Sequence, residues 1–243
     1  MKIFVIIPAA GLGTRMATGG RKGQPSKQFF EINGKPIVMH TLRAFARNKQ
    51  ISQIVVALRK NEMELFRQQL EKEKIPAKVE IVEGGEHRQE SVANAIASLK
   101  AAPDDIVLVH DAVRPFVDDE IIANVIHDAE KYGAAIAGLP AVDTIKQVER
   151  ASDGAIITST IPRERVVQAQ TPQGFRYALL KRAIDDAAAD GFTGTDESSL
   201  VERLGEHVRV VMGSSRNIKI TTPRDLELAE FLFAQGILTT DKH

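Results

Sequence analysis

The chain has 243 residues, a length that fits one large α/β domain or two small ones. Its 43% hydrophobic and 26% charged residues support a sizeable core and argue against intrinsic disorder. A formal net charge of zero gives no general attraction to nucleic acid or acidic membranes, and the lack of cysteines excludes disulfides, thiolate catalysis and cysteine-bound zinc. No apolar run of the sequence approaches the roughly 20 residues of a membrane-spanning helix.

The N-terminal half alternates apolar runs, typical of strands, with amphipathic stretches, typical of helices. The first run, Ile3–Ile7, is too short for a secretion signal, so we predict a strand and a soluble, cytoplasmic protein. Helical patterns begin near Pro36, at Asn61, where Glu64 completes a variant capping box, and near Glu90. The other apolar runs of this half predict strands at Ile54–Leu58, Val79–Val82 and Ile106–Val109.

The C-terminal half continues the alternation. Asp118 is placed to cap a helix that ends at Gly133, and Thr222 with Pro223 begins a last helix that runs to about Gln235. Hydrophobic periodicity predicts further helices near Tyr177–Asp190 and Asp196–Leu204, and strands at Ala134–Leu139, Val208–Met212 and Ile218–Thr221. This order of elements predicts an α/β fold with a doubly wound, mostly parallel sheet and right-handed crossovers.

Residues 140–171 interrupt the alternation, because they show no helical pattern. They predict a protruding β-hairpin arm with strands at Thr144–Val148 and Ile156–Ile161, joined by a turn at residues 152–154. A two-stranded ribbon is marginally stable in water, so we expect the arm to pack on another surface, most simply a second copy of the chain. No repeat or linker requires a second domain, and we predict a single domain over residues 1–243 with an arm at about 140–171.

The first predicted strand leads into the loop PAAGLGTRM. Glycine-rich turns before helices point backbone N–H groups at an anion, and the nearby cations Arg15 and Lys27 suggest more than one phosphate. The loop is not a Walker P-loop, because it lacks the Gly-Lys-Ser/Thr of that motif. It does not fit a dinucleotide-binding fingerprint either, because Met16 occupies the position of the third small residue. On Gly11 and Gly13 alone, a plain strand-to-helix turn is an equally good interpretation.

Two further loops follow strands at the edge of the sheet where ligands bind. In VHDAVRP, Asp111 can accept hydrogen bonds from hydroxyls or help to hold a metal, and Arg114 can pair with phosphate. A mutual salt bridge between these two side chains is the alternative. Lys219 alternates with Ile218 and Ile220, so it is expected to point away from the core and could reach a phosphate, unless it is merely a solvated lysine.

The loop EGGEHRQES follows the third predicted strand. Its two glycines let the backbone approach a flat group closely, and Glu86 and Ser91 could read a sugar or a base edge. A plain helix cap is the alternative for Ser91. The six histidines show no metal-ligand spacing, and we interpret them as surface or structural residues, with only His110 near the site.

Taken together, the loops resemble the 2-C-methyl-D-erythritol 4-phosphate cytidylyltransferase family over nearly the whole chain. The resemblance implies a Rossmann-like nucleotidyltransferase fold and a homodimer in which the β-arm of each subunit reaches the active site of the other. It also implies transfer of a cytidylyl group from CTP to the polyol phosphate, with Mg²⁺, in the non-mevalonate route to isoprenoid precursors. The matching motifs, in family order, are PAAGLGTRM, SKQF, GGEHRQES, VHDAVRPF, DTIK, TIPRERVVQAQTPQGF, GTDESSLVE and NIKITTPRDL.

The resemblance also implies roles for single residues, although it identifies no metal ligands. The family usually has aspartate where this chain has Glu86. The implied catalytic residues are Arg15, Lys27 and Lys219. The nucleotide would be bound by Ala9, Ala10, Gly11, Gly13, Gly85, Glu86 and Ser91. The acceptor would be bound by Asp111, Arg114, Thr171 and, from the neighbouring subunit, Thr144 and Arg163.

The expected chemistry needs charge compensation rather than a general base. A phosphate oxygen is already a nucleophile at neutral pH, but one anion must approach another, so positioning and electrostatics govern the reaction. A ribitol 5-phosphate cytidylyltransferase remains the nearest alternative, and the spacing of Thr160 and Arg163 favours methylerythritol phosphate modestly. A nicotinamide-dependent oxidoreductase and a non-enzymatic nucleotide sensor are the alternatives from other classes.

Overall fold

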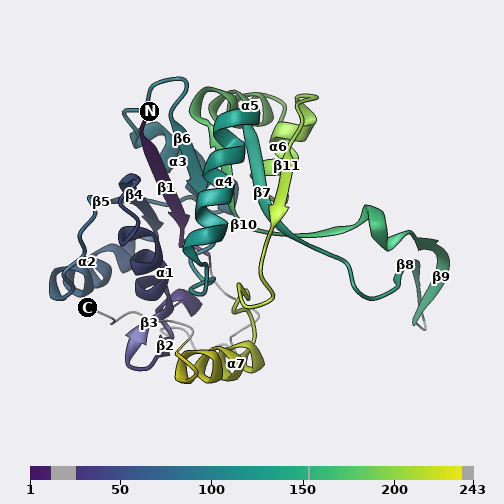
Figure 1. Cartoon of the computed structure of the whole chain (residues 1–243), viewed down its shortest axis with the longest axis horizontal. Helices are drawn as coiled ribbons and strands as arrows, with labels where there is room; N and C mark the ends of the chain where they lie inside the picture. Colours follow the sequence, from purple (N-terminus) through teal and green to yellow (C-terminus); the bar gives the residue numbers. More distant parts are fainter. Residues whose placement is uncertain (12–25, 153, 237–243) are drawn as a thin grey trace.

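The computed structural model of the chain describes residues 1–11, 26–152 and 154–236. A seven-stranded sheet in the order β11-β7-β10-β6-β1-β4-β5 forms its centre (Figure 1). Strand β10 runs antiparallel to β6 and β7, and the other strand pairs of this sheet are parallel. The predicted α/β fold is therefore confirmed. The strands are β1 (Ile3–Pro8), β4 (Ile51–Leu58), β5 (Val79–Glu83), β6 (Ile106–Val109), β7 (Ala134–Pro140), β10 (Val167–Arg176) and β11 (Arg209–Met212).

Helices cover both faces of the sheet, because successive side chains of each strand point to opposite sides. In β1, Val5 and Ile7 enter a core cluster with α1, α2 and α4, whereas Phe4 and Ile6 enter a second cluster with α3, α5 and α6. Both clusters are made of buried aliphatic and aromatic side chains. The helices are α1 (Ile37–Ala46), α2 (Met63–Lys72), α3 (Arg88–Ser98), α4 (Asp119–Tyr132), α5 (Tyr177–Ala189), α6 (Glu197–Arg203) and α7 (Pro223–Ala234).

A third apolar cluster lies below the sheet, where α7 packs near the short hairpin of β2 (Glu31–Ile32) and β3 (Lys35–Pro36) (Figure 1). Ile220 is fully buried in this cluster, and its backbone N–H donates to the carbonyl of Val113 at 2.9 Å. The cluster thereby fixes the segment that carries Lys219 against the loop that follows β6.

Helix ends largely follow the predicted capping residues. The carboxylate of Asp118 accepts a hydrogen bond from the Ile121 backbone at 2.8 Å, and α4 ends at Gly133, whose φ of 93° suits glycine. Capping boxes also begin α6 and α7. The box predicted at Asn61 is wrong, because a short 3-10 helix (η2, Lys60–Glu62) precedes α2 and no side chain caps it.

Two predicted features of the sheet are wrong. Residues 167–171 were predicted to belong to the arm but lie in β10, a strand that the sequence does not predict because it contains a proline and a glycine and shows no regular alternation. Its place between β6 and β7 is decided by tertiary pairing. The segment Ile218–Thr221 is not a strand, since the bond from the Ile220 backbone to Val113 is not repeated in a ladder along the segment.

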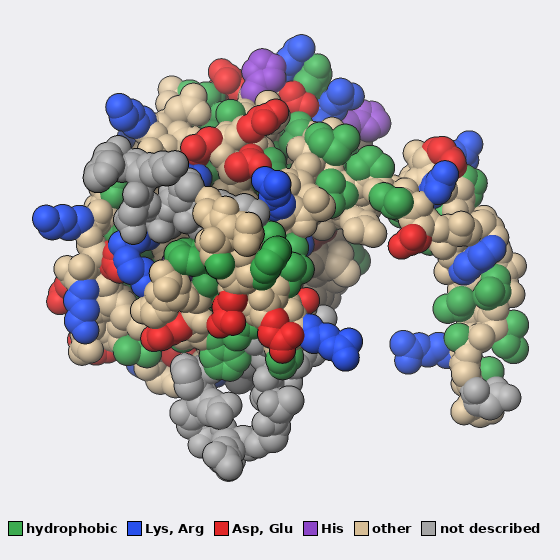
Figure 2. Space-filling model, turned by 60° about the horizontal axis from the view of Figure 1, so that its bottom comes forward, with side chains coloured by type: hydrophobic (Ala, Val, Ile, Leu, Met, Phe, Trp, Pro, Cys, Tyr) green, Lys and Arg blue, Asp and Glu red, His purple; other side chains and the backbone are tan. Residues whose placement is uncertain are grey.

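The predicted arm is present as a separate two-stranded sheet of β8 (Ile145–Ala151) and β9 (Gly154–Ile161). It stands away from the body of the chain and carries hydrophobic and basic side chains (Figures 1 and 2). Val142, Ile156 and Ile157 are 79%, 63% and 59% exposed. Among the described residues, no helix combines the length and apolar character needed to cross a membrane. The boundary of a single domain at residues 1–243 stays a prediction.

Gly174 on β10 offers a test of how closely α4 packs on the sheet. A Cβ added at Gly174 would lie 2.8 Å from Cγ1 of Val125 and 2.9 Å from Cδ2 of Leu108. We expect Gly174→Ala to lower the free energy of unfolding by about 1–3 kcal/mol through overpacking, as measured by urea denaturation. An unchanged unfolding midpoint would show that α4 moves outward without cost.

Candidate active site

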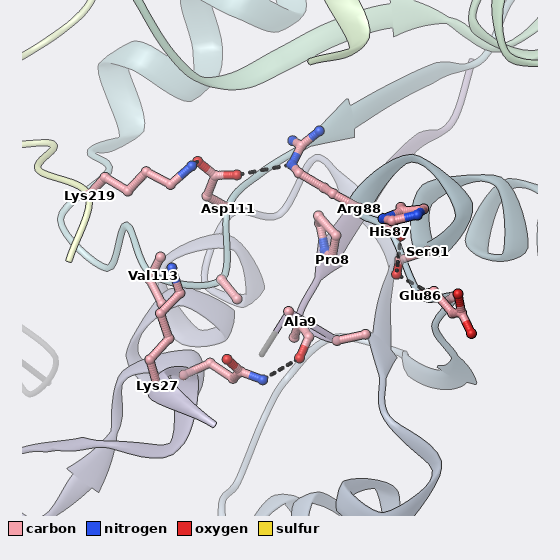
Figure 3. A pocket seen from close by; sticks show the side chains of 15 residues that line it. Pro8, Ala9, Lys27, Glu86, His87, Arg88, Ser91, Asp111, Val113 and Lys219 are labelled. Carbon is pink, nitrogen blue, oxygen red and sulfur yellow. Dashed lines mark hydrogen bonds and ion pairs between the residues drawn. The ribbon is translucent and has the colours of Figure 1, made fainter. Parts of the chain in front are cut away.

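A cavity lies where the carboxyl ends of β1, β5 and β6 meet (Figure 3). Parallel strands bring their carboxyl ends to one edge of a sheet, so the loops that follow them converge there. Lys219 enters from the segment before α7, and Lys27 from the short helix η1 (Lys27–Phe29). The cavity is lined by Pro8, Ala9, Ala10, Gly11, Lys27, Gln28, Gly85, Glu86, His87, Arg88, Ser91, Asp111, Ala112, Val113 and Lys219.

Most of the predicted site residues meet at this edge of the sheet. Arg114 and Thr171 line a second cavity beside the first, together with Gln170, Gln173, Thr195 and Asp196. Three residues, Arg88, Asp111 and Lys219, line both cavities. The predicted residues found in the first cavity are Ala9, Ala10, Gly11, Lys27, Gly85, Glu86, Ser91, Asp111 and Lys219.

Two predicted residues do not join either cavity within their own chain. Thr144 and Arg163 belong to the arm, where both are exposed and Arg163 donates to the carbonyl of Val142 at 2.8 Å. Arg15 and Gly13 lie outside the described residues, so their roles stay predictions.

Hydrogen bonds hold the first glycine loop against its neighbours. The Ala9 backbone N–H donates to Ala57 at 2.7 Å, and the buried side chain of Gln28 donates to the carbonyl of Ala9 (Figure 3). Arg59 donates to the carbonyl of Ala10 at 3.1 Å. With these carbonyls satisfied, Ala9 and Ala10 have a fixed position at the wall of the cavity.

The loop after β5 approaches the first loop so closely that it requires glycine. A Cβ added at Gly84 would lie 2.5 Å from Cβ of Ala10 and 2.9 Å from Oγ of Ser91. The Ser91 hydroxyl accepts from the Gly85 backbone and donates to the carbonyl of His87, both at 3.1 Å. The residue that caps α3 is His87, so the alternative of Ser91 as the helix cap is wrong.

Asp111 is surrounded by three cations from three parts of the chain. Its Oδ1 lies 3.3 Å from Nε of Arg88, and its Oδ2 lies 2.8 Å from Nζ of Lys219 (Figure 3). The same Oδ2 lies 3.3 Å from Nε of Arg114. Burial raises the pKa of Asp111, but the three cations outweigh it and hold this pKa well below its usual range. The carboxylate is therefore charged at neutral pH and is not a proton donor or general base.

The salt bridge considered for Asp111 and Arg114 therefore exists, but as part of this larger cluster. Lys219 is also not a simple solvated lysine, since it pairs with Asp111.

His110 joins the loop after β6 to β10 through a chain of hydrogen bonds in which each side chain accepts from one neighbour and donates to the next. Its Nε2 lies 2.9 Å from the carbonyl oxygen of Arg114, which can only accept, so Nε2 carries the proton. Its Nδ1 then accepts from the Thr171 hydroxyl at 3.1 Å, and Thr171 in turn accepts from the Asp111 backbone at 3.1 Å. This arrangement suits a neutral imidazole. It agrees with complete burial, which lowers the pKa of His110 to about 4.

Sequence reasoning missed four residues that shape the site. His87 lines the first cavity, so the expectation that only His110 lies near the site is wrong. Arg88 lies with His87 in the motif GGEHRQES, Gln28 lies in SKQF and Glu197 lies in GTDESSLVE. Their hydrogen-bond partners come from distant parts of the chain, so only the fold reveals them. Among the described residues, no group of three His, Asp or Glu side chains could hold a metal ion.

Comparisons with known proteins agree on one family. The family model described as "IspD: 2-C-methyl-D-erythritol 4-phosphate cytidylyltransferase" matches residues 3–235. A relative of that name from Acidobacterium capsulatum is 58% identical over 235 residues, covering 97% of this chain and 98% of the relative. Another from Solibacter usitatus is 51% identical over 238 residues, covering 97% of each chain.

Solved structures give the same result for the fold. The 4-diphosphocytidyl-2C-methyl-D-erythritol synthase of Anaerococcus prevotii superposes with a TM-score of 0.81 at 32% identity and covers 96% of each chain. The 2-C-methyl-D-erythritol 4-phosphate cytidylyltransferase of Thermus thermophilus superposes with a TM-score of 0.75 at 34% identity, covering 96% of this chain and 98% of that one.

The neutral state of His110 predicts how stability depends on pH. Its folded pKa of about 4 lies below the ordinary value of 6.5, so the unfolded chain binds a proton first as the pH falls. Neutral His110 therefore contributes roughly 3 kcal/mol to the free energy of unfolding above pH 6.5, and this contribution is lost as the pH falls to about 4. In denaturant titrations, His110→Asn should flatten the pH dependence in this window, whereas the exposed-site variant His207→Asn should keep the wild-type slope. Equal slopes in all three proteins would contradict the assignment.

Proposed function

The chain belongs to the IspD family of 2-C-methyl-D-erythritol 4-phosphate cytidylyltransferases, and on that premise we propose how its residues carry out the reaction. The enzyme transfers the cytidylyl group of CTP to 2-C-methyl-D-erythritol 4-phosphate and releases pyrophosphate, in the non-mevalonate route to isoprenoid precursors. The observation that carries the proposed mechanism is the group of cations around Asp111, placed where two cavities adjoin. Relatives named for this substrate support it over ribitol 5-phosphate.

The first cavity suits the nucleotide. The loops after β1 and β5 present backbone groups and small residues, which let a flat base and a ribose approach closely. We assign Ala9, Ala10, Gly11, Gly85 and Ser91 to this role. Glu86, together with Gly13 from outside the described residues, completes the proposed nucleotide set, and Glu86 lies across the cavity from Lys219 (Figure 3).

The second cavity suits the polyol phosphate. Arg114 and Thr171 line it, and an arginine can bind phosphate or hydroxyl oxygens. The Asp111 carboxylate has about four acceptor sites, of which the three cations use three, so one remains for a substrate hydroxyl. Asp111 can therefore bind a hydroxyl of the acceptor while it remains at the centre of the cation cluster.

In the proposed reaction, an oxygen of the acceptor phosphate attacks the α-phosphorus of CTP. A new P–O bond forms as the bond to the bridging oxygen of the β-phosphate breaks, and the electron pair leaves with pyrophosphate. The acceptor phosphate is already ionised, so no base is needed. Lys27, Lys219 and Arg15 reduce the repulsion between the two anions and stabilise the charge that develops on the α-phosphoryl oxygens.

A divalent metal, Mg²⁺ in our proposal, fits this site if the triphosphate supplies its ligands instead of a set of protein side chains. Asp111 is already engaged by three cations, and no cluster of metal-ligating side chains occurs in the described ranges. Mg²⁺ commonly keeps several waters and binds through substrate phosphates. When bound, it would neutralise triphosphate charge and favour the departure of pyrophosphate.

We further propose that the enzyme is a homodimer in which the arm completes the partner's acceptor site. The arm stands away from its own body and exposes apolar side chains (Figure 2). A ribbon of two strands is marginal alone, so a partner surface would stabilise it. Thr144 and Arg163 would then bind the acceptor phosphate across the interface. The cytoplasmic location and the lack of nucleic-acid or membrane partners stay predictions.

A coupled pyrophosphate assay tests the proposed function. The purified chain, CTP and Mg²⁺ should release pyrophosphate rapidly with 2-C-methyl-D-erythritol 4-phosphate and slowly with ribitol 5-phosphate. Rapid release with ribitol 5-phosphate alone would support the rival cytidylyltransferase. Tight NADH binding without CTP binding would support an oxidoreductase, and CTP binding without release with any polyol phosphate would support a sensor.

The two lysines test the charge-compensation mechanism. Lys27→Ala and Lys219→Ala should each lower kcat on the order of 10²–10³-fold, as the loss of a donor to a developing anion does. Circular dichroism and the unfolding midpoint should show that both variants fold. Near-normal kcat in both variants would refute the mechanism.

Mixed dimers test whether the arm crosses to the partner. Arg163→Ala and Lys219→Ala should each be nearly inactive alone, because every site in either homodimer lacks one group. After random subunit exchange, half of the dimers are mixed and each has one intact site, so roughly a quarter of the wild-type activity should return. A mixture as inactive as its components would show that each subunit uses its own arm or that no subunits exchange, and co-purification of an affinity-tagged variant with the untagged one decides between these.

A further inference from the structure

Arg88, Asp111 and Lys219 form the wall that the two cavities share. In the proposed reaction this wall lies between the nucleotide and the acceptor, so the orientation of its side chains sets how the substrates meet. Asp111 is 9% exposed, and its two oxygens are held from different directions, Oδ1 by Arg88 and Oδ2 by Arg114 and Lys219. Arg88 is thus the partner of Oδ1 in this cluster.

Arg88 is itself held by a carboxylate outside both cavities. Its Nη1 lies 2.6 Å from Oε1 of Glu197, whose side chain is 2% exposed and lines neither cavity. Burial disfavours the charge on Arg88, but Glu197 and Asp111 outweigh this effect and raise its pKa above the ordinary value. The guanidinium can bridge two carboxylates because its N–H groups point in fixed directions.

Glu197 is fixed by the strand that sequence reasoning missed. The side chain of Gln173 on β10 donates to Asp196 at 2.7 Å and accepts from the backbone of Ser198 at 3.1 Å. Asp196 also caps α6 through the backbone of Ser199. These bonds attach the first turn of α6 to the sheet on both sides of Glu197. The backbone from which the Glu197 side chain extends is therefore held in place.

We infer that Glu197 is a positioning residue that acts through Arg88 to orient Asp111 toward the acceptor. This inference rests on the proposed function of the second cavity. Without the negative charge of Glu197, Arg88 keeps one carboxylate partner, pairs more fully with Asp111 and turns that side chain away from Arg114 and Lys219. The effect is expected mainly in the acceptor half of the site, because Arg114, which shares Asp111 with Arg88, and Asp196, the neighbour of Glu197, line the second cavity and not the first.

Steady-state kinetics of Glu197→Gln test the inference, since glutamine keeps the shape of the side chain and removes its charge. We expect kcat/KM for the polyol phosphate to fall on the order of 10- to 100-fold, because a misplaced substrate group is costly. KM for CTP should stay within about twofold of the wild-type value if the change is confined to the acceptor half. Arg88→Lys should act in the same direction, since an ammonium does not reproduce the fork of a guanidinium. The double variant should be no worse than the more impaired single variant, because the two residues act as a unit.

The surface pair of Arg182 and Glu206 provides the control, since its atoms are also 2.6 Å apart but its side chains are 53% and 47% exposed. Glu206→Gln should change neither kinetic constant. If Glu197→Gln lowers the unfolding midpoint but keeps wild-type kinetics, the residue only stabilises the fold and the inference is overturned. An equal rise of KM for both substrates would also overturn it. A wild-type enzyme without cytidylyl transfer would instead refute the proposed function.

Discussion

A buried carboxylate among cations is the constraint on which the candidate site depends. Without Asp111, the positive groups of Arg88, Arg114 and Lys219 would repel one another within a few ångströms, and without them the carboxylate would not remain ionised in a buried place. Three cations against the two carboxylates of Asp111 and Glu197 leave a local excess of positive charge. A chain with no net charge can therefore still present a local cationic surface at the site proposed for its anionic substrates.

The antiparallel strand β10 connects this cluster to the rest of the molecule. It follows the arm directly, carries Thr171 beside His110 and places Gln173 against α6. One strand therefore links the arm, the loop after β6 and the helix that bears Glu197. This continuity gives a physical route by which packing of the arm on a partner would affect the acceptor side of the site.

Local patterns were sufficient for much of the fold and for many site positions. The strand Ile106–Val109 was predicted to the residue because a fully buried strand is a continuous apolar run between polar loops. Ala9, Gly85 and Asp111 line one cavity, as expected for loops after parallel strands, which converge at one edge of a sheet, and their roles stay predictions. The strand β10 was missed because proline and glycine weaken the local signal, and its neighbours β6 and β7 compensate through pairing.

The sequence by itself determined the helices and most of the strands, the glycine loops and the presence of acidic and basic residues in them, because these are encoded in neighbouring residues with periods of two or 3.6. Only the tertiary structure decided which charges meet. Arg88 and Glu197 are 109 positions apart, and their contact depends on α3 and α6 packing on the same face of the sheet. It also decided that Thr144 and Arg163 lie outside the cavities of their own chain, since the path of the arm depends on the fold around it and not on the residues of the hairpin.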